Sequence, residues 1–166
     1  MPFYFHSHVQ VISRGKGKSA VAAAAYRAGE LIKNNYDGIV HDYTHKGGVV
    51  HTEILLPAHA PAEYANRAVL WNAVEKIEKA ENAQLARELD IALPRELTLE
   101  QNIALARDYV QRTFVSAGMC ADLCLHDTSE GNPHFHLMLT MCGEVLINYF
   151  RYMQLTLLAL LGQPRH

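Results

Sequence analysis

Apolar and polar side chains alternate along much of this chain, and the alternation predicts five strands. Within residues 84–93, Leu85 and Leu89 fall on one face of an extended chain, whereas Glu88 and Asp90 fall on the other. The last two expected strands flank a turn-rich segment, as in a β-hairpin. The five expected strands are residues 4–13, 49–56, 84–93, 119–127 and 133–141.

Helical periodicity and capping residues predict three helices between these strands. The first helix begins after Ser19, a good N-cap, and carries Tyr26. The second spans residues 62–81, where apolar residues recur at the spacing of an amphipathic helix. The third begins with a capping box at Thr98 and runs to about Ala117.

The resulting order, β-α-β-α-β-α-β-β, favours an α+β fold. The closing hairpin and the half-polar strands fit a mostly antiparallel sheet with helices on one face better than a parallel sheet. No internal repeat or flexible linker divides the chain, and 166 residues with 49% hydrophobic composition suffice for one core. We therefore expect one globular domain.

Charge and cysteine content bear on the type of partner and on the cellular compartment of the protein. The net charge of −2 argues mildly against a nucleic-acid partner, because phosphate affinity comes mostly from Lys and Arg. Residues 1–60 soften that objection, since they hold six Lys or Arg against four Asp or Glu. Three cysteines in no ligand spacing, with no leader before Phe3, predict a reducing, cytoplasmic setting.

Three histidines near the hairpin form a candidate metal site. Alternation puts His134 and His136 on one face of their strand, and His126 belongs to the facing strand. Three neutral imidazoles can bind a divalent ion and leave positions open for a substrate oxygen. A solvated or hydrogen-bonded histidine pair remains the alternative, although Glu88 and Asp90 on a polar strand face favour the metal site.

Tyr26 is a candidate nucleophile for a phosphodiester. Its attack would store the bond energy in a covalent intermediate, if a base or a cation assists. Small alanines surround it, and its neighbour Arg27 can neutralise a phosphate. The preceding loop offers an anion the cations Arg14, Lys16 and Lys18 and a helix N-terminus. The alternative is a packed tyrosine beside a solvated turn.

Four segments in order resemble the MobA/MobL family of plasmid relaxases, and together they cover residues 3 to about 141. The first is VQVISRGKGKSAVAAAAYR at 9–27. The others are HDYTHKGGVVH at 41–51, QLARELDIALP at 84–94 and NPHFH at 132–136. Four matching segments in sequence are far more specific than any one of them.

This resemblance implies an HUH-type endonuclease with a ferredoxin-like antiparallel sheet, helices on one side and the active site on the other. Tyr26 matches the family's nucleophile, and Glu88 matches an acidic position that acts as a base or polariser. The metal ligands are matched by His126, His134 and His136. Such enzymes nick single-stranded DNA at a plasmid transfer origin, keep the 5′ phosphate on tyrosine, and act with relaxosome accessory proteins and a coupling protein.

Two points of the resemblance stay open. Residues 1–142 are expected to form the relaxase domain, whereas residues 143–166 are an unusually apolar tail that departs from the family, as in a truncated or out-of-frame ending. No stretch of the tail is long enough for a membrane span. The metal is expected to be Mg or Mn, although imidazoles also bind Zn, Co and Ni.

Other functions compete with the nicking enzyme. A truncated relaxase fragment would bind single-stranded DNA or a relaxosome partner without cutting, and a hydrolase would use the histidine site with water on a small substrate. A rolling-circle replication initiator commonly carries a second tyrosine near the first, but Tyr26 is the only one between Ser19 and Glu30.

Overall fold

A computed structural model describes residues 7–127 and 131–141. Its centre is one five-stranded sheet in which every neighbouring pair is antiparallel, in the order β1-β5-β7-β6-β4. All five predicted strands are present in this sheet. Their bounds are β1 Ser7–Ser13, β4 Val49–Leu55, β5 Gln84–Ala92, β6 Ala121–His126 and β7 His134–Leu139.

Three α-helices connect these strands, as the capping residues predict. They are α1 Ala20–Ala28, α2 Arg67–Ile77 and α3 Leu99–Val110. The Ser19 hydroxyl accepts a hydrogen bond from Ala22 N, and Thr98 with Gln101 completes the predicted capping box. The fold is therefore α+β with a central antiparallel sheet, in agreement with the sequence.

The structure adds elements that the periodicity did not predict. A small hairpin of β2 Leu31–Lys33 and β3 Val40–Asp42 follows α1. Its strands are too short to show an alternation. Short helical turns also occur at η1 Arg14–Lys16, η2 Ala62–Ala65 and η3 Gln111–Val115, the last of them a π-helix.

Two of these turns change a predicted helix. The interval 62–81 is split at Asn66, whose backbone is extended and whose side chain caps α2 by accepting from Val69 N. The third helix changes to π geometry after Val110. The apolar tail at 143–166 lies outside the described residues.

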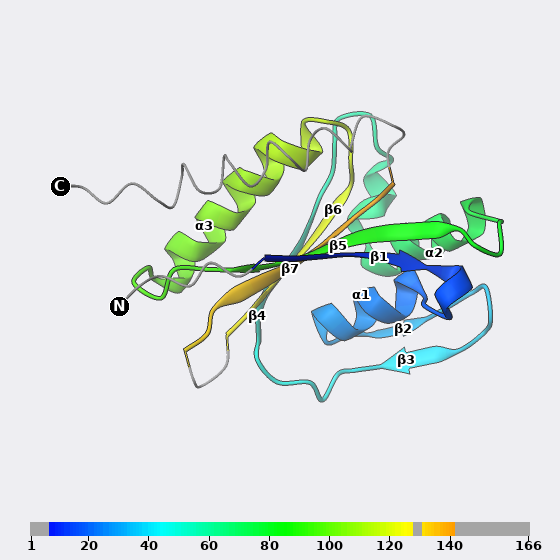
Figure 1. The fold of residues 1–166 in the computed structure, drawn as a ribbon, viewed down its shortest axis with the longest axis horizontal. Coiled ribbons are helices and arrows are strands. Elements are labelled where there is room, and N and C mark those ends of the chain that lie inside the picture. The colour runs from blue at the N-terminus through cyan, green and yellow to red at the C-terminus, as the bar shows by residue number, and fades with distance from the viewer. Residues whose placement is uncertain (1–6, 128–130, 142–166) are drawn as a thin grey trace.

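Helices cover both faces of the sheet, whereas the sequence predicted them on one. Figure 1 shows α3 on one side and α1 with the β2–β3 hairpin on the other. The reason is that the strands are apolar on both faces. Phe135, Leu137 and Leu139 of β7 pack in the α3 layer, whereas Met138 packs in the layer of α1 and α2. A strand buried on both faces needs cover on both.

Candidate functional site

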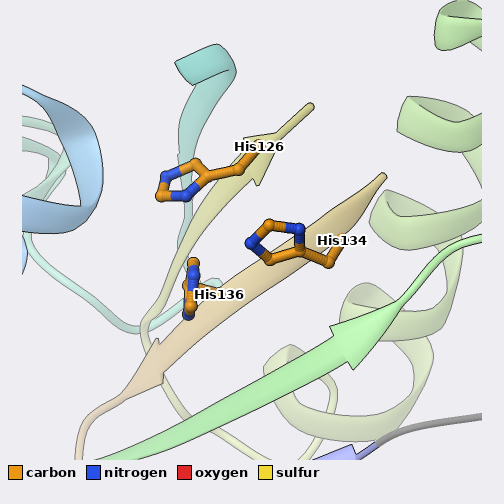
Figure 2. A group of neighbouring side chains, drawn as sticks. All are labelled: His126, His134 and His136. Carbon is orange, nitrogen blue, oxygen red and sulfur yellow. The ribbon is translucent and has the colours of Figure 1, made fainter. Parts of the chain in front are cut away.

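The register of the β6–β7 hairpin brings the three histidines together. His126 lies directly opposite His134, and His136 lies opposite Cys124, two residues before His126 on the same face. The ring centroids are 4.7 to 5.5 Å apart. Figure 2 shows the rings from β6 and β7 gathered at one point. One nitrogen from each ring lies within 4.8 Å of the other two, close enough for a single metal ion to be held.

Backbone carbonyls fix which nitrogen of two rings carries a lone pair. His126 Nε2 lies 2.6 Å from the carbonyl oxygen of Arg27, and His134 Nδ1 lies 2.8 Å from that of Asn132. A carbonyl only accepts, so these nitrogens carry the protons. Nδ1 of His126 and Nε2 of His134 therefore keep a lone pair that can bind a cation, which is the arrangement found in histidine metal sites.

His136 is oriented by carboxylates. Its Nδ1 lies 3.5 Å from Glu88 Oε1 and 4.0 Å from Asp90 Oδ2. Among the described residues this buried nitrogen has no hydrogen-bond partner within normal distance. An imidazole that turns one nitrogen toward carboxylates offers its other nitrogen as a ligand, so the chemistry of the donor set fits a metal ion.

Glu88 is a buried carboxylate held by several donors. Gln10 Nε2 donates to its Oε2 at 2.7 Å, and Arg27 Nε donates to its Oε1. Burial alone would raise the pKa of Glu88, but the interactions with His136 and Arg27 outweigh burial and lower that pKa to about 2. Glu88 is therefore ionised at neutral pH.

His126 is held neutral by its surroundings. Burial lowers its pKa to about 4, and the charges of Lys46, His136 and His134 act in the same direction, against the hydrogen bond to Arg27. A neutral imidazole is the form that binds a metal ion. His126 can therefore bind a cation at neutral pH without first losing a proton.

Tyr26 lies in the last turn of α1, one residue before the carbonyl that contacts His126. Its side chain is 42% exposed. Tyr43 meets its ring edge-on at 5.1 Å between centroids, and Lys46 Nζ lies 3.9 Å from the ring centroid. The phenol is thus accessible at the end of a helix that touches the histidine cluster.

Packing at both ends fixes the position of α1. Buried Glu75 of α2 accepts from Ser19 Oγ at 2.9 Å and from Ala20 N at 2.8 Å, so it caps the helix N-terminus from outside. Gly29 ends the helix with φ +68°, a conformation that favours glycine. The segment carrying Tyr43 lies against this end, with its carbonyl 3.6 Å from where a Cβ of residue 29 would be.

The four predicted DNA-contacting cations have different surroundings. Lys16 and Lys18 are exposed, and Lys18 Nζ donates to Gln10 Oε1 at 3.0 Å, which links the loop to Glu88 through Gln10. Arg27 pairs with Glu88 and remains partly exposed.

Arg14 is engaged within the fold. Its guanidinium donates to the Glu75 carboxylate at 2.9 Å and to carbonyls of Glu75, Glu78 and Ala80. Nη1 and Nη2 of Arg14 thus have partners within the fold and its Nε is buried, so this geometry favours an anchoring role and the phosphate contact stays a prediction.

Sequence reasoning did not single out Lys46, Tyr43 or Gln10. Gln10 pairs directly with Glu88 in the β1–β5 register, so their side chains share one face of the sheet. Alternation could therefore have indicated Gln10. Lys46 and Tyr43 lie in the irregular segment between β3 and β4, where no periodicity operates.

Within the described residues, no helix is both long and apolar enough to cross a membrane.

Comparison with known proteins places this geometry in a family context. Residues 18–143 match the MobA/MobL family. The chain is 47% identical over 146 residues to the conjugal transfer protein TraA of Agrobacterium fabrum (strain C58). The aligned region covers 82% of this chain and 13% of that protein. It is 48% identical over 122 residues to the mobilization protein MobL of Acidithiobacillus ferridurans, which covers 74% of this chain and 32% of that one.

A solved structure has a similar fold. It is described as "Molecular Basis of Vancomycin Resistance Transfer in Staphylococcus aureus", and it matches with a TM-score of 0.80 and 35% identity over 85% of this chain and 72% of that chain. The chain thus spans only 13% and 32% of the length of these two curated relatives, and most of the solved chain.

Proposed function

Because the chain belongs to the MobA/MobL family, we propose that it nicks single-stranded DNA at a plasmid transfer origin through attack of Tyr26 on a phosphodiester. One observation supports this most. The accessible phenol belongs to the residue before Arg27, whose carbonyl contacts a cluster of two buried histidines and one partly buried histidine. Relatives named conjugal transfer and mobilization proteins agree with the DNA-processing role, and the reaction would occur in the cytoplasm, with the plasmid.

The proposed reaction is a transesterification. The Tyr26 oxygen forms a bond to phosphorus, and the bond between phosphorus and the 3′ oxygen of the preceding nucleotide breaks. The phenol proton leaves to solvent, and the departing 3′ oxygen takes one up. The products are a 5′-phosphotyrosine and a free 3′ hydroxyl, and attack by that hydroxyl reverses the step.

His126, His134 and His136 would hold a divalent cation beside the scissile phosphate. When bound, such an ion supplies Lewis-acid stabilisation of the charge that develops on the phosphate oxygens. Mn, Co, Ni and Zn suit three imidazoles, and Mg is the further candidate for a site facing phosphate.

In this proposal Glu88 positions neighbouring side chains and does not serve as the general base. A carboxylate whose pKa is about 2 is a poor general base at neutral pH, since base catalysis is most effective when the pKa lies near the working pH. We therefore assign Glu88 to orient His136 and to hold Arg27 in place. Arg27, Lys16 and Lys18 provide the positive charge for the DNA backbone.

A covalent trap tests the proposal. The protein is incubated with a single-stranded origin oligonucleotide labelled on the 3′ side of the nick, with Mn²⁺ or Mg²⁺, and resolved under denaturing conditions. We expect a protein–DNA adduct that is lost in Tyr26→Phe and retained in Tyr36→Phe, a matched change at another exposed tyrosine. An adduct that persists in Tyr26→Phe contradicts the proposal. Binding without cleavage across several divalent metals favours the fragment that only binds DNA or relaxosome partners.

A further inference from the structure

Besides the neighbouring Arg27, whose guanidinium lies 5.1 Å from the ring centroid, one short segment contacts the ring of Tyr26, namely residues 43–46 between β3 and β4. Tyr43 contacts the ring edge-on, with an interplanar angle of 85°. Lys46 Nζ lies over the ring face and also donates a hydrogen bond to the Tyr26 carbonyl oxygen at 2.9 Å. Backbone and side chain of the same residue are thus held by one ammonium group.

This segment is itself well anchored. Tyr43 N donates to Glu30 O at 3.1 Å, just beyond the end of α1, and Lys46 N donates to Tyr43 O at 2.9 Å, which closes a turn. Two residues further on, Gly48 O accepts from Asp127 N, next to His126. The segment therefore connects the end of α1 to the strand end that carries a histidine of the cluster.

Lys46 is suited to this place by charge. The C-terminal end of a helix carries partial negative charge that attracts a cation. An aromatic face does the same. Lys46 is half-buried, and its pKa is lowered first by that burial and then by the neighbouring Arg27, whereas Glu88 and Cys124 raise it. It therefore lies within electrostatic reach of both Glu88 and His126.

We propose that Lys46 is a positioning residue for the nucleophile: its ammonium group holds the Tyr26 ring at the C-terminal end of α1, next to the residue whose carbonyl contacts His126. The inference rests on the proposed function, because it assigns a partner to the tyrosine that carries the reaction. The physical reason is that nucleophilic attack is steeply sensitive to geometry. A misplacement of about 1 Å costs roughly 100-fold in rate.

Kinetics of Lys46→Met test the proposal. This change keeps the length and apolar stem of the side chain and removes the charge. We expect single-turnover adduct formation to fall by roughly 10-fold to 100-fold, while the affinity for the origin oligonucleotide changes by less than about threefold. Lys46→Arg should restore most of the rate, because a guanidinium also stacks on an aromatic face.

Lys33→Met is the matched control, since Lys33 is an exposed lysine on neighbouring β2. It should nick at the wild-type rate. A Lys46→Met protein that nicks like wild type overturns the inference. So does one whose defect lies in DNA affinity alone, since that result would make Lys46 a phosphate contact. Failure of the proposed function is a separate result, namely an adduct that survives Tyr26→Phe in the presence of an intact Lys46.

A spectroscopic measurement keeps the test valid if Lys46→Met fails to fold. In the wild-type protein, the ring current of Tyr26 should shift the ε-methylene protons of Lys46 upfield in the NMR spectrum. Tyr26→Leu should return them to the position of an exposed lysine such as Lys33. Unshifted Lys46 protons in the wild-type protein would contradict the proposed contact.

Discussion

His126 and Glu88 show how the surroundings of one residue set its protonation. Both pKa values are lowered, His126 mainly by burial and Glu88 by donors that outweigh burial. The consequence at neutral pH is a neutral ligand, His126, in a cluster whose His136 approaches an ionised carboxylate. That combination attracts a cation, because the ligand need not lose a proton and the carboxylate supplies negative charge.

The lowered pKa of His126 predicts acid lability. The unfolded chain binds a proton on this ring below about pH 6.5, and the native protein binds it only near pH 4. Stability should therefore be complete above pH 6.5 and fall as the pH drops toward 4, by up to about 3 kcal/mol. Urea unfolding at several pH values, with chelator present, measures this loss.

His126→Gln removes the titrating ring and should flatten the slope of stability between pH 6.5 and 4, whatever its effect on stability at pH 7. Glu88 acts in a lower window, since its stabilising contribution is lost as the pH falls from about 4.5 to about 2. A His126→Gln protein with the wild-type slope would show that another group controls the acid transition.

Alternation along the sequence was enough to predict which residues of the site share a face. It put His134 with His136, and the antiparallel register then set His126 opposite His134. Alternation could not reveal Lys46, because the position of an irregular segment depends on contacts with distant residues, here the end of α1. Nor could it show that Arg14 points into the fold, since sequence alone does not reveal its partner Glu75.

At the level of elements, α1 depends on α2 for its place over the sheet. The buried carboxylate of Glu75 caps α1 and is itself neutralised by Arg14. A helix of nine residues is marginal by itself, so this tertiary cap contributes to its stability. Any loosening of the cap would also move Tyr26 at the opposite end of the same helix.

Arg14→Ala should therefore destabilise the fold by about 3 kcal/mol, because it leaves a buried carboxylate without its partner. The loss would appear as a lower denaturation midpoint in urea. Lys16→Ala, an exposed change two residues away, should alter stability by no more than about 0.5 kcal/mol. If Arg14→Ala leaves stability unchanged but weakens DNA binding, that result would support the phosphate contact predicted from the sequence.

Elements with strong local signals were predictable, and elements without them were not. The Ser19 cap and the Thr98 capping box fixed two helix starts correctly. The β2–β3 hairpin escaped prediction, because three-residue strands carry too few positions for a period of two to appear. The π geometry from Gln111 onward has no distinct periodicity in the sequence either.

On the scale of the whole molecule, the histidine cluster joins the two strands of the β6–β7 hairpin next to the C-terminal end of α1. The overall α+β class followed from the order of elements, whereas the cover on both faces depends on side-chain burial that alternation only suggests. A ligand that binds all three rings would bind only the folded chain, since the rings come together through the β6–β7 register.

Metal should therefore stabilise the protein. Binding restricted to the native state adds about 2.7 kcal/mol when the free metal exceeds its dissociation constant by 100-fold. We expect Mn²⁺ to raise the melting temperature and a chelator to reverse the shift. His134→Gln should abolish most of the shift, and His59→Gln, a histidine outside the cluster, should retain it. Equal shifts in both variants would place the metal elsewhere.

The distribution of charge over the molecule predicts how DNA binding responds to salt. The net charge is −2, so attraction to the phosphate backbone must come from a few local cations. Lys16 and Lys18 are exposed, whereas Arg27 is already paired with Glu88. Two phosphate contacts with single-stranded DNA give a slope of about −1.4 in log affinity against log salt, and three give about −2.1.

Lys18→Met should reduce the magnitude of this slope by about 0.7 in a fluorescence-anisotropy titration, and Lys33→Met should leave it unchanged. A wild-type slope steeper than about −4 would require additional cationic contacts, and the loop at 14–18 would then not be the main DNA contact.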